Sequence, residues 1–492
     1  MRVQSVKWPA AAALLVLAGA AGCGSQYRPV INPVVPTGPA AQPTSYAIVF
    51  SQPELTLPAN LPTTAPPCPT VNDVFQSYAS PGVVTIVDFS GDSIMALAEV
   101  GNGPLGFALD STGSNAYSEN CDGTISSVPI SQSLKSDQVG TSTLLAGAVP
   151  INSLVAAGSQ YVVEEGRDAI AAMSGSPPAL KQEVPVAPSV INVTGAQTGQ
   201  RVYSISQGNV NTPGFAWGTC ADPSSVTVTG EADAIEVATN TISARLPLGI
   251  CPVYGVSSAD GRRAFILNRG SGTITVINSQ LNTLDTTLNA TGTINLCGGT
   301  GACNAGPVFA DLYTPGNLLV VSNYDNNTVS VIDVSLDVYG NDSPTFGKIL
   351  ATVPVGQHPA AVTILQDGSR AYTANEGVVC TGNNTATCTT SGSVTVVNLT
   401  SMTVESTINL GSACPNPRTV VSTYNYPTGK VYAVSQNSSN LSIIRTDTDT
   451  VSATLIMQGN IVDVRTTSQY AGSTTQGGNN ITGSRAVGSG AP

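Results

Sequence analysis

Short apolar runs alternate with turn residues along most of this chain. The segment Cys251–Asn278 reads CPVYGVSSADGRRAFILNRGSGTITVIN, and an Asp-Gly turn separates its first two apolar runs. In its third run, Ile274 and Val276 alternate with threonines. A period of two residues and tight turns of this kind predict antiparallel strands that are joined by hairpins.

The same unit recurs along the sequence. It reappears at Gly306–Asp333, at His358–Asn398 with a longer loop, and in a looser form at Cys414–Arg445. The prolines that begin the seven recognisable units are Pro104, Pro150, Pro188, Pro252, Pro307, Pro359 and Pro415. Repeats of roughly 40 to 50 residues with four strands each are typical of β-propeller blades, which pack face to face around an axis.

Each unit predicts four strands, which we call A to D from the inner to the outer edge of the blade. In the unit that begins at His358, the four predicted strands are Val362–Leu365, Arg370–Asn375, Ser393–Asn398 and Val404–Leu410. The B–C loops and the D–A linkers of such a blade emerge on one rim of the ring, which we call the B–C rim. The A–B and C–D turns emerge on the opposite rim, the A–B rim.

Several of these phrases resemble a known repeat family. AFILNRGSGTITVIN, LLVVSNYDNNTVSVID and AYTANEG…GSVTVVN resemble the YVTN-family β-propeller repeat, and ATVPVGQHP and STINLGSACP resemble its fourth strand and blade linker. The resemblance is good over residues 250–445 and weaker over 80–250. It implies an all-β propeller, commonly seven-bladed, in a secreted or surface protein. Propellers of this kind include binding modules, lactonase-like enzymes and redox subunits, so the resemblance does not decide the chemistry.

The number of blades is predicted to be seven or eight. Seven units contain all four strands, whereas Gly82–Gly101 provides only a C–D pair. Ile461–Thr466, near the other end of the chain, could supply a closing strand A. An eighth blade would then be divided between the two ends of the chain and would close the ring, while the family resemblance favours seven blades.

The N-terminal residues predict an exported, lipid-anchored protein. Residues 1–22 combine a short positive region with an apolar stretch, and Ala20-Ala21-Gly22 leads into Cys23. This pattern resembles the lipobox of bacterial lipoproteins, in which the cysteine is acylated. Acyl chains on Cys23 would hold the protein at a membrane without crossing it. The expected location is the bacterial envelope, on the outer membrane and facing either the periplasm or the outside; an ordinary signal peptide is the alternative.

The ends of the chain differ from its centre in composition. Residues 23–70 hold eleven prolines and predict an extended tether, within which Ser45–Phe50 is a candidate strand. Residues 71–470 are the predicted propeller. Residues 471–492 are rich in glycine, serine, threonine and asparagine, and they predict a disordered tail.

Charge narrows the classes of partner. Only 10% of the 492 residues are charged, and the 18 basic against 30 acidic residues give a net charge of −12. An acidic chain of this kind is poorly suited to binding nucleic acid or an anionic membrane surface. We therefore expect a monomer that has a protein or glycan partner, makes no nucleic-acid contact, and touches the membrane through its lipid anchor alone.

The cysteines predict disulfides rather than a metal site. Acylation of Cys23 leaves nine of the ten cysteines in an oxidising compartment, so one thiol is left over. Eight of these fall in predicted B–C loops and D–A linkers, and therefore on one rim. The candidate pairs are Cys220 with Cys251, Cys297 with Cys303, and Cys380 with Cys388, with Cys414 as a competitor for either partner in the last pair. Without a CxxC or CxxCH motif, neither a bound metal nor another cofactor is expected.

Carboxylates on the same rim are the candidate binding residues. They are Asp122, Glu164, Asp168, Asp325 and Glu376, all at predicted B–C turns. Converging carboxylates can bind a cation or act as acid and base, whereas solubility and turn capping are the simpler interpretation. His358 is the only histidine, and its place in a blade linker favours a structural role over a catalytic one.

Two functions remain open from the sequence. The first is a non-enzymatic binding scaffold, displayed on the envelope, whose B–C rim holds a protein or glycan partner. The alternative is a lactonase-like hydrolase that uses rim carboxylates and a bound cation. Convergence of carboxylates from three or more blades on one central pocket would favour the hydrolase.

Overall fold

The computed structural model describes the propeller, and both ends of the chain lie outside the described residues. The described residues are 45–53, 81–110, 112–164, 167–196, 199–208, 227–297, 304–313, 317–380, 388–390, 392–411, 414, 416–423, 429–435 and 438–467. The predicted signal peptide, Cys23 and the predicted tail lie outside these residues. No helix in the described ranges is long and apolar enough to cross a bilayer.

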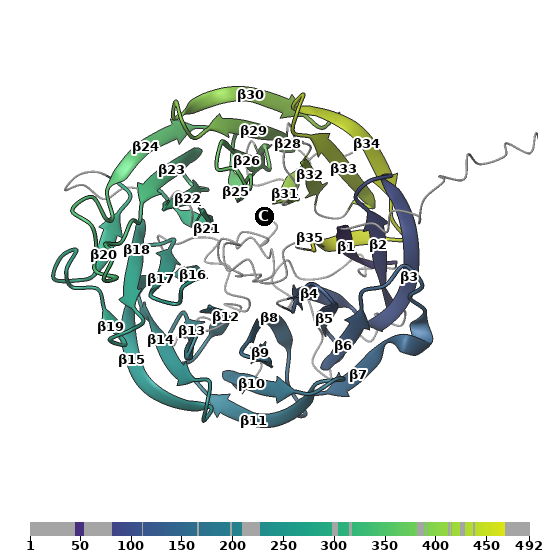
Figure 1. The fold of residues 1–492 in the computed structure, drawn as a ribbon, viewed down its shortest axis with the longest axis horizontal. Coiled ribbons are helices and arrows are strands. Elements are labelled where there is room, and N and C mark those ends of the chain that lie inside the picture. Colours follow the sequence, from purple (N-terminus) through teal and green to yellow (C-terminus); the bar gives the residue numbers. More distant parts are fainter. Residues whose placement is uncertain are drawn as a thin grey trace, which may run out of the picture. The chain divides into compact units, whose positions relative to one another are not determined.

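Eight four-stranded antiparallel sheets form an eight-bladed β-propeller (Figure 1). From the inner to the outer strand, blade 1 consists of β35 (Asn460–Thr466), β1 (Tyr46–Gln52), β2 (Pro81–Asp88) and β3 (Ser93–Asn102). Blade 2 consists of β4 (Pro104–Leu109), β5 (Asn115–Asn120), β6 (Thr124–Pro129) and β7 (Gly140–Thr143), with a single 3-10 turn, η1 (Ser136–Gln138), before β7. Blade 3 consists of β8 (Pro150–Ala156), β9 (Ser159–Glu164), β10 (Ala169–Ser174) and β11 (Ala179–Pro185). Blade 4 consists of β12 (Val190–Gly195), β13 (Arg201–Ser206), β14 (Thr229–Glu236) and β15 (Thr241–Ile250).

The remaining blades follow the same order. Blade 5 consists of β16 (Pro252–Ser257), β17 (Arg263–Asn268), β18 (Thr273–Asn278) and a fourth strand split into β19 (Thr283–Leu284) and β20 (Thr293–Asn295). Blade 6 consists of β21 (Pro307–Tyr313), β22 (Leu318–Asn323), β23 (Thr328–Asp333) and β24 (Ile349–Pro354). Blade 7 consists of β25 (Pro359–Ile364), β26 (Arg370–Asn375), β29 (Ser393–Asn398) and β30 (Thr403–Asn409), and its B–C loop carries the hairpin β27 (Val378–Cys380) and β28 (Cys388–Thr390). Blade 8 consists of β31 (Pro417–Ser422), β32 (Lys430–Ser435), β33 (Asn440–Arg445) and β34 (Thr450–Ile456).

The ring is closed by a blade that both ends of the propeller share. The inner strand β35 comes from the C-terminal side, and it pairs antiparallel with β1, so that Val49 lies opposite Val464 (Figure 1). Around the axis, each inner strand contacts the inner strands of the two neighbouring blades, and β35 contacts both β31 and β4. Of the two predicted blade counts, eight is confirmed, with the eighth blade divided between the two ends of the propeller, and the count of seven that the family resemblance favours is wrong. The propeller also includes Tyr46–Gln52, a segment that its proline-rich surroundings place in the tether.

Burial explains why the strands of a blade differ in composition. The four central residues of β18, β23 and β29 are buried on both faces, because each blade is covered by a blade on either side. The outer strands β15 and β30 instead alternate between exposed and less exposed residues. Strand C is therefore buried on both faces although a threonine or serine interrupts its apolar residues, whereas strand D alternates between more and less exposed positions.

The asparagine that ends many B strands bonds to strand C of its own blade, and Asn268 also bonds to the outer strand of the preceding blade. Asn268 Nδ2 donates to the hydroxyls of Thr273 and Thr275 at 3.2 and 2.9 Å, and its Oδ1 accepts from the backbone N–H of Gly249 at 3.1 Å. A Cβ on Gly249 would lie 2.8 Å from Asn268, so the close approach requires glycine. Asn323 and Asn375 make the same bonds to strand C hydroxyls. These bonds support a structural role for the recurring asparagines.

Candidate functional site

On the B–C rim, the residue that follows strand B reaches across to the next blade. In blade 4, Gln207 Nε2 donates to the backbone carbonyl of Pro252 at 3.0 Å. In blade 5, Arg269 donates two hydrogen bonds to Asp325, the shorter of 2.7 Å. In blade 6, the hydroxyl of Tyr324 donates to Glu376 at 2.8 Å. The rim thus links one blade to the next through side chains at equivalent positions.

Six side chains on the B–C rim form one continuous cluster over blades 5 to 8, which we call the rim network. Its members are Arg269, Tyr324, Asp325, His358, Glu376 and Arg418. The Arg269 guanidinium lies 5.0 Å from the centre of the Tyr324 ring, and the His358 ring stacks on the same tyrosine at 4.8 Å and 17°. Arg418, on the inner strand of blade 8, forms an ion pair with Glu376 at 2.7 Å.

The rim network balances its own charge. It holds two arginines against two carboxylates, and both Arg269 and Glu376 are buried. Burial and the adjacent Glu376 carboxylate raise the pKa of Tyr324, which keeps its hydroxyl a neutral donor. Ion-paired carboxylates are poor candidates for a cation site, and the described side chains include no group of three or more His, Cys, Asp or Glu that could hold a metal.

His358 is held by its backbone as well as by its ring. Its φ of 52° lies in the left-handed region, and its backbone N–H donates to the Asn327 side chain at 2.8 Å. The stacking on Tyr324 places the imidazole inside the rim network. These contacts support the structural role that the sequence favours.

The other predicted rim carboxylates do not join this network. Asp122 is exposed and accepts from the backbone N–H groups of Asn102 and Thr124, which is turn capping. Asp168 accepts from the backbone of Ser189 at 2.8 Å. Glu164 is fully buried at the end of β9, where burial raises the pKa of its carboxyl. Of the five candidates, the structure joins only Asp325 and Glu376, because Arg269 binds Asp325 and lies over the ring of Tyr324, whose hydroxyl donates to Glu376.

The bonding state of the described cysteines is compatible with the oxidising compartment that the sequence predicts. Cys121, Cys251 and Cys297 are disulfide-bonded. In the hairpin of blade 7, Cys380 lies directly opposite Cys388 in the backbone register. Cys414 is a buried free thiol that accepts from the Ser435 hydroxyl, and burial raises its pKa to about 11. Cys220 and Cys303 lie outside the described residues, so the three pairs stay predictions.

Glu119 is a buried acid that the sequence analysis missed. It lies on β5, in the segment NAYSEN, and it is fully buried. One carboxylate oxygen accepts from the hydroxyl of Ser153, on the inner strand of blade 3. Burial raises the pKa of Glu119 to about 7, and the charge of Arg465 opposes that rise. The sequence contains one signal that could have revealed this residue, because a glutamate within a strand that is expected to be buried is unusual.

The raised pKa of Glu119 predicts a pH-dependent stability. The folded protein holds this proton up to about pH 7, whereas the unfolded chain releases it near the ordinary glutamate pKa of 4.5. Stability from this group is therefore present at low pH and lost as pH rises from about 4.5 to about 7. Between pH 5 and pH 8, the wild type should lose about 2–3 kcal/mol more of its free energy of unfolding than Glu119→Gln loses. Urea unfolding of both proteins at the two pH values measures this difference. Glu405→Gln, at an exposed position on β30, is the control, and equal pH dependence in Glu119→Gln and the wild type would contradict the assignment.

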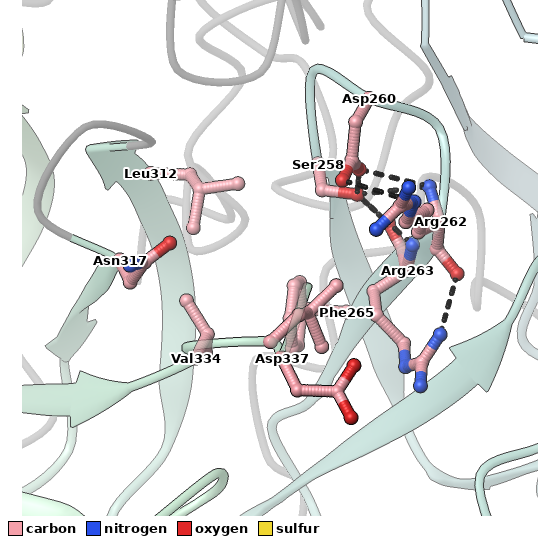
Figure 2. A pocket seen from close by; sticks show the side chains of 10 residues that line it. Ser258, Asp260, Arg262, Arg263, Phe265, Leu312, Asn317, Val334 and Asp337 are labelled. Atoms are coloured by element: carbon pink, nitrogen blue, oxygen red, sulfur yellow. Dashed lines mark hydrogen bonds and ion pairs between the residues drawn. The ribbon is translucent and has the colours of Figure 1, made fainter. Parts of the chain in front are cut away.

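Two cavities lie on the opposite, A–B rim. One of about 360 Å³ lies between blades 4 and 5, and includes Arg201, Ser257 and Gln280 in its lining. The other, which we call the blade 5–6 pocket, has a volume of about 200 Å³. In Figure 2, Phe265, Leu312 and Val334 lie between Asp260 at the top of the view and Asp337 below. No sequence motif predicted either cavity.

Comparison with known proteins supports the propeller and a surface location. A family model described as the Choice-of-anchor I domain matches residues 257–441, rather more than a third of the chain. This description suggests a cell-surface or secreted bacterial protein. The match does not test the resemblance to the YVTN repeat, which stays a prediction. No curated protein sequence matches the chain.

Solved structures show the same fold at low sequence identity. AztD from Citrobacter koseri is 11% identical, with a TM-score of 0.54 over 86% of this chain and 97% of AztD. The dihydro-heme d1 dehydrogenase NirN is 14% identical, with a TM-score of 0.58 over 91% of this chain and 78% of NirN. A candidate 6-phosphogluconolactonase from Bacteroides fragilis is 13% identical, with a TM-score of 0.50 over 87% of this chain and 99% of that protein. The family match and these neighbours together support a β-propeller family for this chain.

Proposed function

We propose that this protein is a non-enzymatic binding scaffold, anchored to the bacterial envelope, whose B–C rim recognises a protein or glycan partner. The observation that carries this proposal is the charge balance of the rim network. Asp325 and Glu376 are each engaged by an arginine of a neighbouring blade, so the network forms a rigid platform instead of an open set of ligands. Loops on a rigid scaffold are the usual place for recognition.

The loops that rise from this platform supply the variable surface. Blade 7 extends its B–C loop by the hairpin β27–β28, whereas its A–B turn is a short Asp-Gly turn. Disulfides at Cys220–Cys251, Cys297–Cys303 and Cys380–Cys388 would hold the loops in place and lower the ordering cost of binding. Acylation of Cys23 would place the monomeric propeller at the membrane surface.

The alternative is a hydrolase that uses rim carboxylates and a cation. Structural neighbours include enzymes, but similarity at 11–14% identity concerns the fold alone. For this chain, a cation at Asp325 or Glu376 would have to displace an arginine. The ion pairs therefore favour the scaffold.

Shortening the B–C loops should abolish partner capture without unfolding the protein. The two variants replace Gly377–Gly392 and Gly208–Ser225 by two-residue turns, and the immobilised proteins are compared on a glycan array and in capture from envelope fractions. Asp367→Asn, on the A–B turn of blade 7, is the control. Unchanged capture by both shortened variants, or lactone hydrolysis that is lost in Glu376→Gln, would contradict the proposal. Membrane partitioning of Cys23→Ser tests the anchor separately, because that variant should lose its lipid.

A further inference from the structure

Both ends of the propeller lie on the A–B rim. Strand β1 is the second strand of blade 1, so it runs from the A–B rim at Tyr46 to the B–C rim at Gln52. The backbone N–H of Tyr46 donates to the Thr467 hydroxyl at 2.8 Å, and the backbone N–H of Thr467 donates to the Tyr46 carbonyl at 2.9 Å. The chain therefore enters and leaves the propeller at the same point of this rim.

The point of entry decides how a tether would hold the propeller at a membrane. The predicted acylation site, Cys23, precedes Ser45 by 22 positions, and a chain of that length spans at most about 75 Å. A tether that joins the propeller at the A–B rim brings that rim to the membrane first. To turn the B–C rim toward the membrane, the same tether would have to pass around the outside of the ring.

The A–B rim also carries a fixed, exposed apolar turn in the C–D loop of blade 6. Val338 is 87% exposed and Tyr339 is 82% exposed, the two highest values among the large hydrophobic side chains of the described residues. The backbone N–H of Gly340 donates to the Asp337 carbonyl at 3.0 Å, which closes the turn. The Asp337 carboxylate accepts from the backbone N–H groups of Tyr339 and Asn341, both at 2.8 Å. A turn that is fixed in this way loses little conformational entropy on binding.

The neighbouring blade adds a further exposed apolar side chain. Leu281, in the C–D turn of blade 5, is 71% exposed, and its backbone N–H donates to Asn278 Oδ1 at 3.2 Å. Both loops lie against Arg262, whose carbonyl accepts from the backbone N–H of Ser279 at 2.9 Å. A Cβ on Gly340 would lie 2.5 Å from the Arg262 guanidinium. The exposed side chains of these adjoining loops form what we call the apolar tip: Leu281, Val338 and Tyr339.

The apolar tip has the chemistry of side chains that enter a bilayer interface. Tyrosine combines an apolar ring with a polar hydroxyl, and it is enriched at the level of lipid headgroups. The charged side chains beside the tip are Asp260, Arg262 and Asp337, so acidic groups outnumber basic ones. This balance disfavours an anionic surface and is compatible with zwitterionic lipid. A contact of three side chains is weak by itself, but a lipid anchor raises its effective concentration at the membrane.

We infer that the A–B rim faces the membrane and that the apolar tip enters the headgroup region of a zwitterionic bilayer. The inference rests on the lipid anchor of the proposed function and adds a second membrane contact, whereas the sequence indicates the anchor alone. In this orientation the B–C rim is turned away from the membrane, where its loops are accessible to a partner.

Tryptophan fluorescence tests the orientation on the lipidated protein. The chain has two tryptophans, Trp8 in the predicted signal peptide and Trp217 between β13 and β14, so the mature protein reports from a B–C loop. Tyr339→Trp combined with Trp217→Phe moves the single reporter to the apolar tip. Both proteins are reconstituted in phosphatidylcholine vesicles, in which part of the lipid carries bromine near the top of its acyl chains.

Bromine quenches only a tryptophan that reaches the lipid. We expect about a twofold loss of fluorescence from the tip reporter. Trp217 should lose none, because the B–C rim is a strand length, about 20 Å, farther from the lipid. Adding anionic lipid should reduce the quenching of the tip reporter, and stronger quenching there would overturn the assignment to a zwitterionic surface.

Matched substitutions test whether the apolar side chains make the contact. In the tip-reporter protein, Leu281→Asp with Val338→Asp should reduce the quenching severalfold, because carboxylates resist transfer from water. Ile456→Asp is the control at a position that is 73% exposed, at the B–C end of β34, and it should leave the quenching unchanged. Equal effects of the two changes would overturn the role of the apolar tip.

Flotation with the vesicles reports the anchor separately. A protein that does not float shows that the proposed lipid anchor is wrong, and the quenching is then measured with a histidine tag in place of Cys23 and a nickel-chelating lipid. In either format, bound protein whose tip reporter is not quenched, or whose Trp217 is quenched equally, overturns the inference.

Discussion

Replacing Arg263 by methionine should lower the free energy of unfolding by about 3–5 kcal/mol. The Arg263 side chain is only 3% exposed, and it neutralises Asp285, which is 1% exposed, together with Asp342. Methionine keeps most of the apolar volume but leaves the buried Asp285 and the partly buried Asp342 without a cation. Urea unfolding followed by circular dichroism measures the loss.

The control for Arg263 is an arginine whose ion pair faces water. Arg445 pairs with Asp447, and these side chains are 52% and 38% exposed. Arg445→Met should change stability by about 1 kcal/mol or less, because exposed ion pairs contribute little. Adding Asp285→Asn to Arg263→Met should recover part of the loss. Equal effects of the two arginine substitutions would show that Arg263 does not balance buried charge.

Arg263 belongs to a recurring contact that joins blades on the A–B rim. Arg370, also the first residue of its strand B, bonds to Asp449 in the C–D turn of the next blade at 2.8 Å. Lys430 starts strand B of blade 8 and bonds to Asp92 of blade 1 at 2.5 Å. The two rims therefore hold the blades together by different side chains, and the B–C rim network is the counterpart of these contacts.

Local pattern was sufficient to predict most strands. In blade 7 the strands Arg370–Asn375 and Ser393–Asn398 have the predicted bounds, because apolar runs and turn glycines specify where a strand begins and ends. Ring closure was predictable for the same reason, since Ile461–Thr466 was an inner strand without a blade. Tyr46–Gln52 was harder to place, because the prolines on both sides of it are typical of a tether.

The contacts of the rim network were harder to predict from the sequence than the strands were. Asp325 and Glu376 were candidates as acids at turns, but their partners Arg269 and Arg418 come from other blades. Pairing of this kind depends on which way each side chain leaves the strand, and repeat spacing does not specify that direction. The blade 5–6 pocket was missed for a related reason, since the loop of Asp337 is an insertion in blade 6 with no counterpart in the repeat.

Removing β35 should prevent the propeller from folding. A chain that ends at Gly459 lacks the inner strand of blade 1, and β1 is left with an unpaired edge along Ala47–Gln52. The lost strand buries Ile461 and Val464, which are 4% and 1% exposed, and it contacts both β31 and β4. Loss of two large core side chains and of a full strand ladder should cost well over about 5 kcal/mol. Thermal melting followed by circular dichroism should show no cooperative transition.

The matched control is a chain that ends at Thr467, because it keeps all of β35 and removes only residues 468–492. It should melt within about 2 °C of the full chain, since no described contact is lost. Val464→Asp is a milder test of the same closure, and it should cost about 3–5 kcal/mol by placing a carboxylate opposite Val49 in the core. A chain that ends at Gly459 and still melts cooperatively near the wild-type temperature would mean that seven blades close without the eighth. In that case, β1, β2 and β3 would be held to the ring by the contacts of β1 with β4 and of β3 with β5 and β6, and by the bond of Lys430 to Asp92.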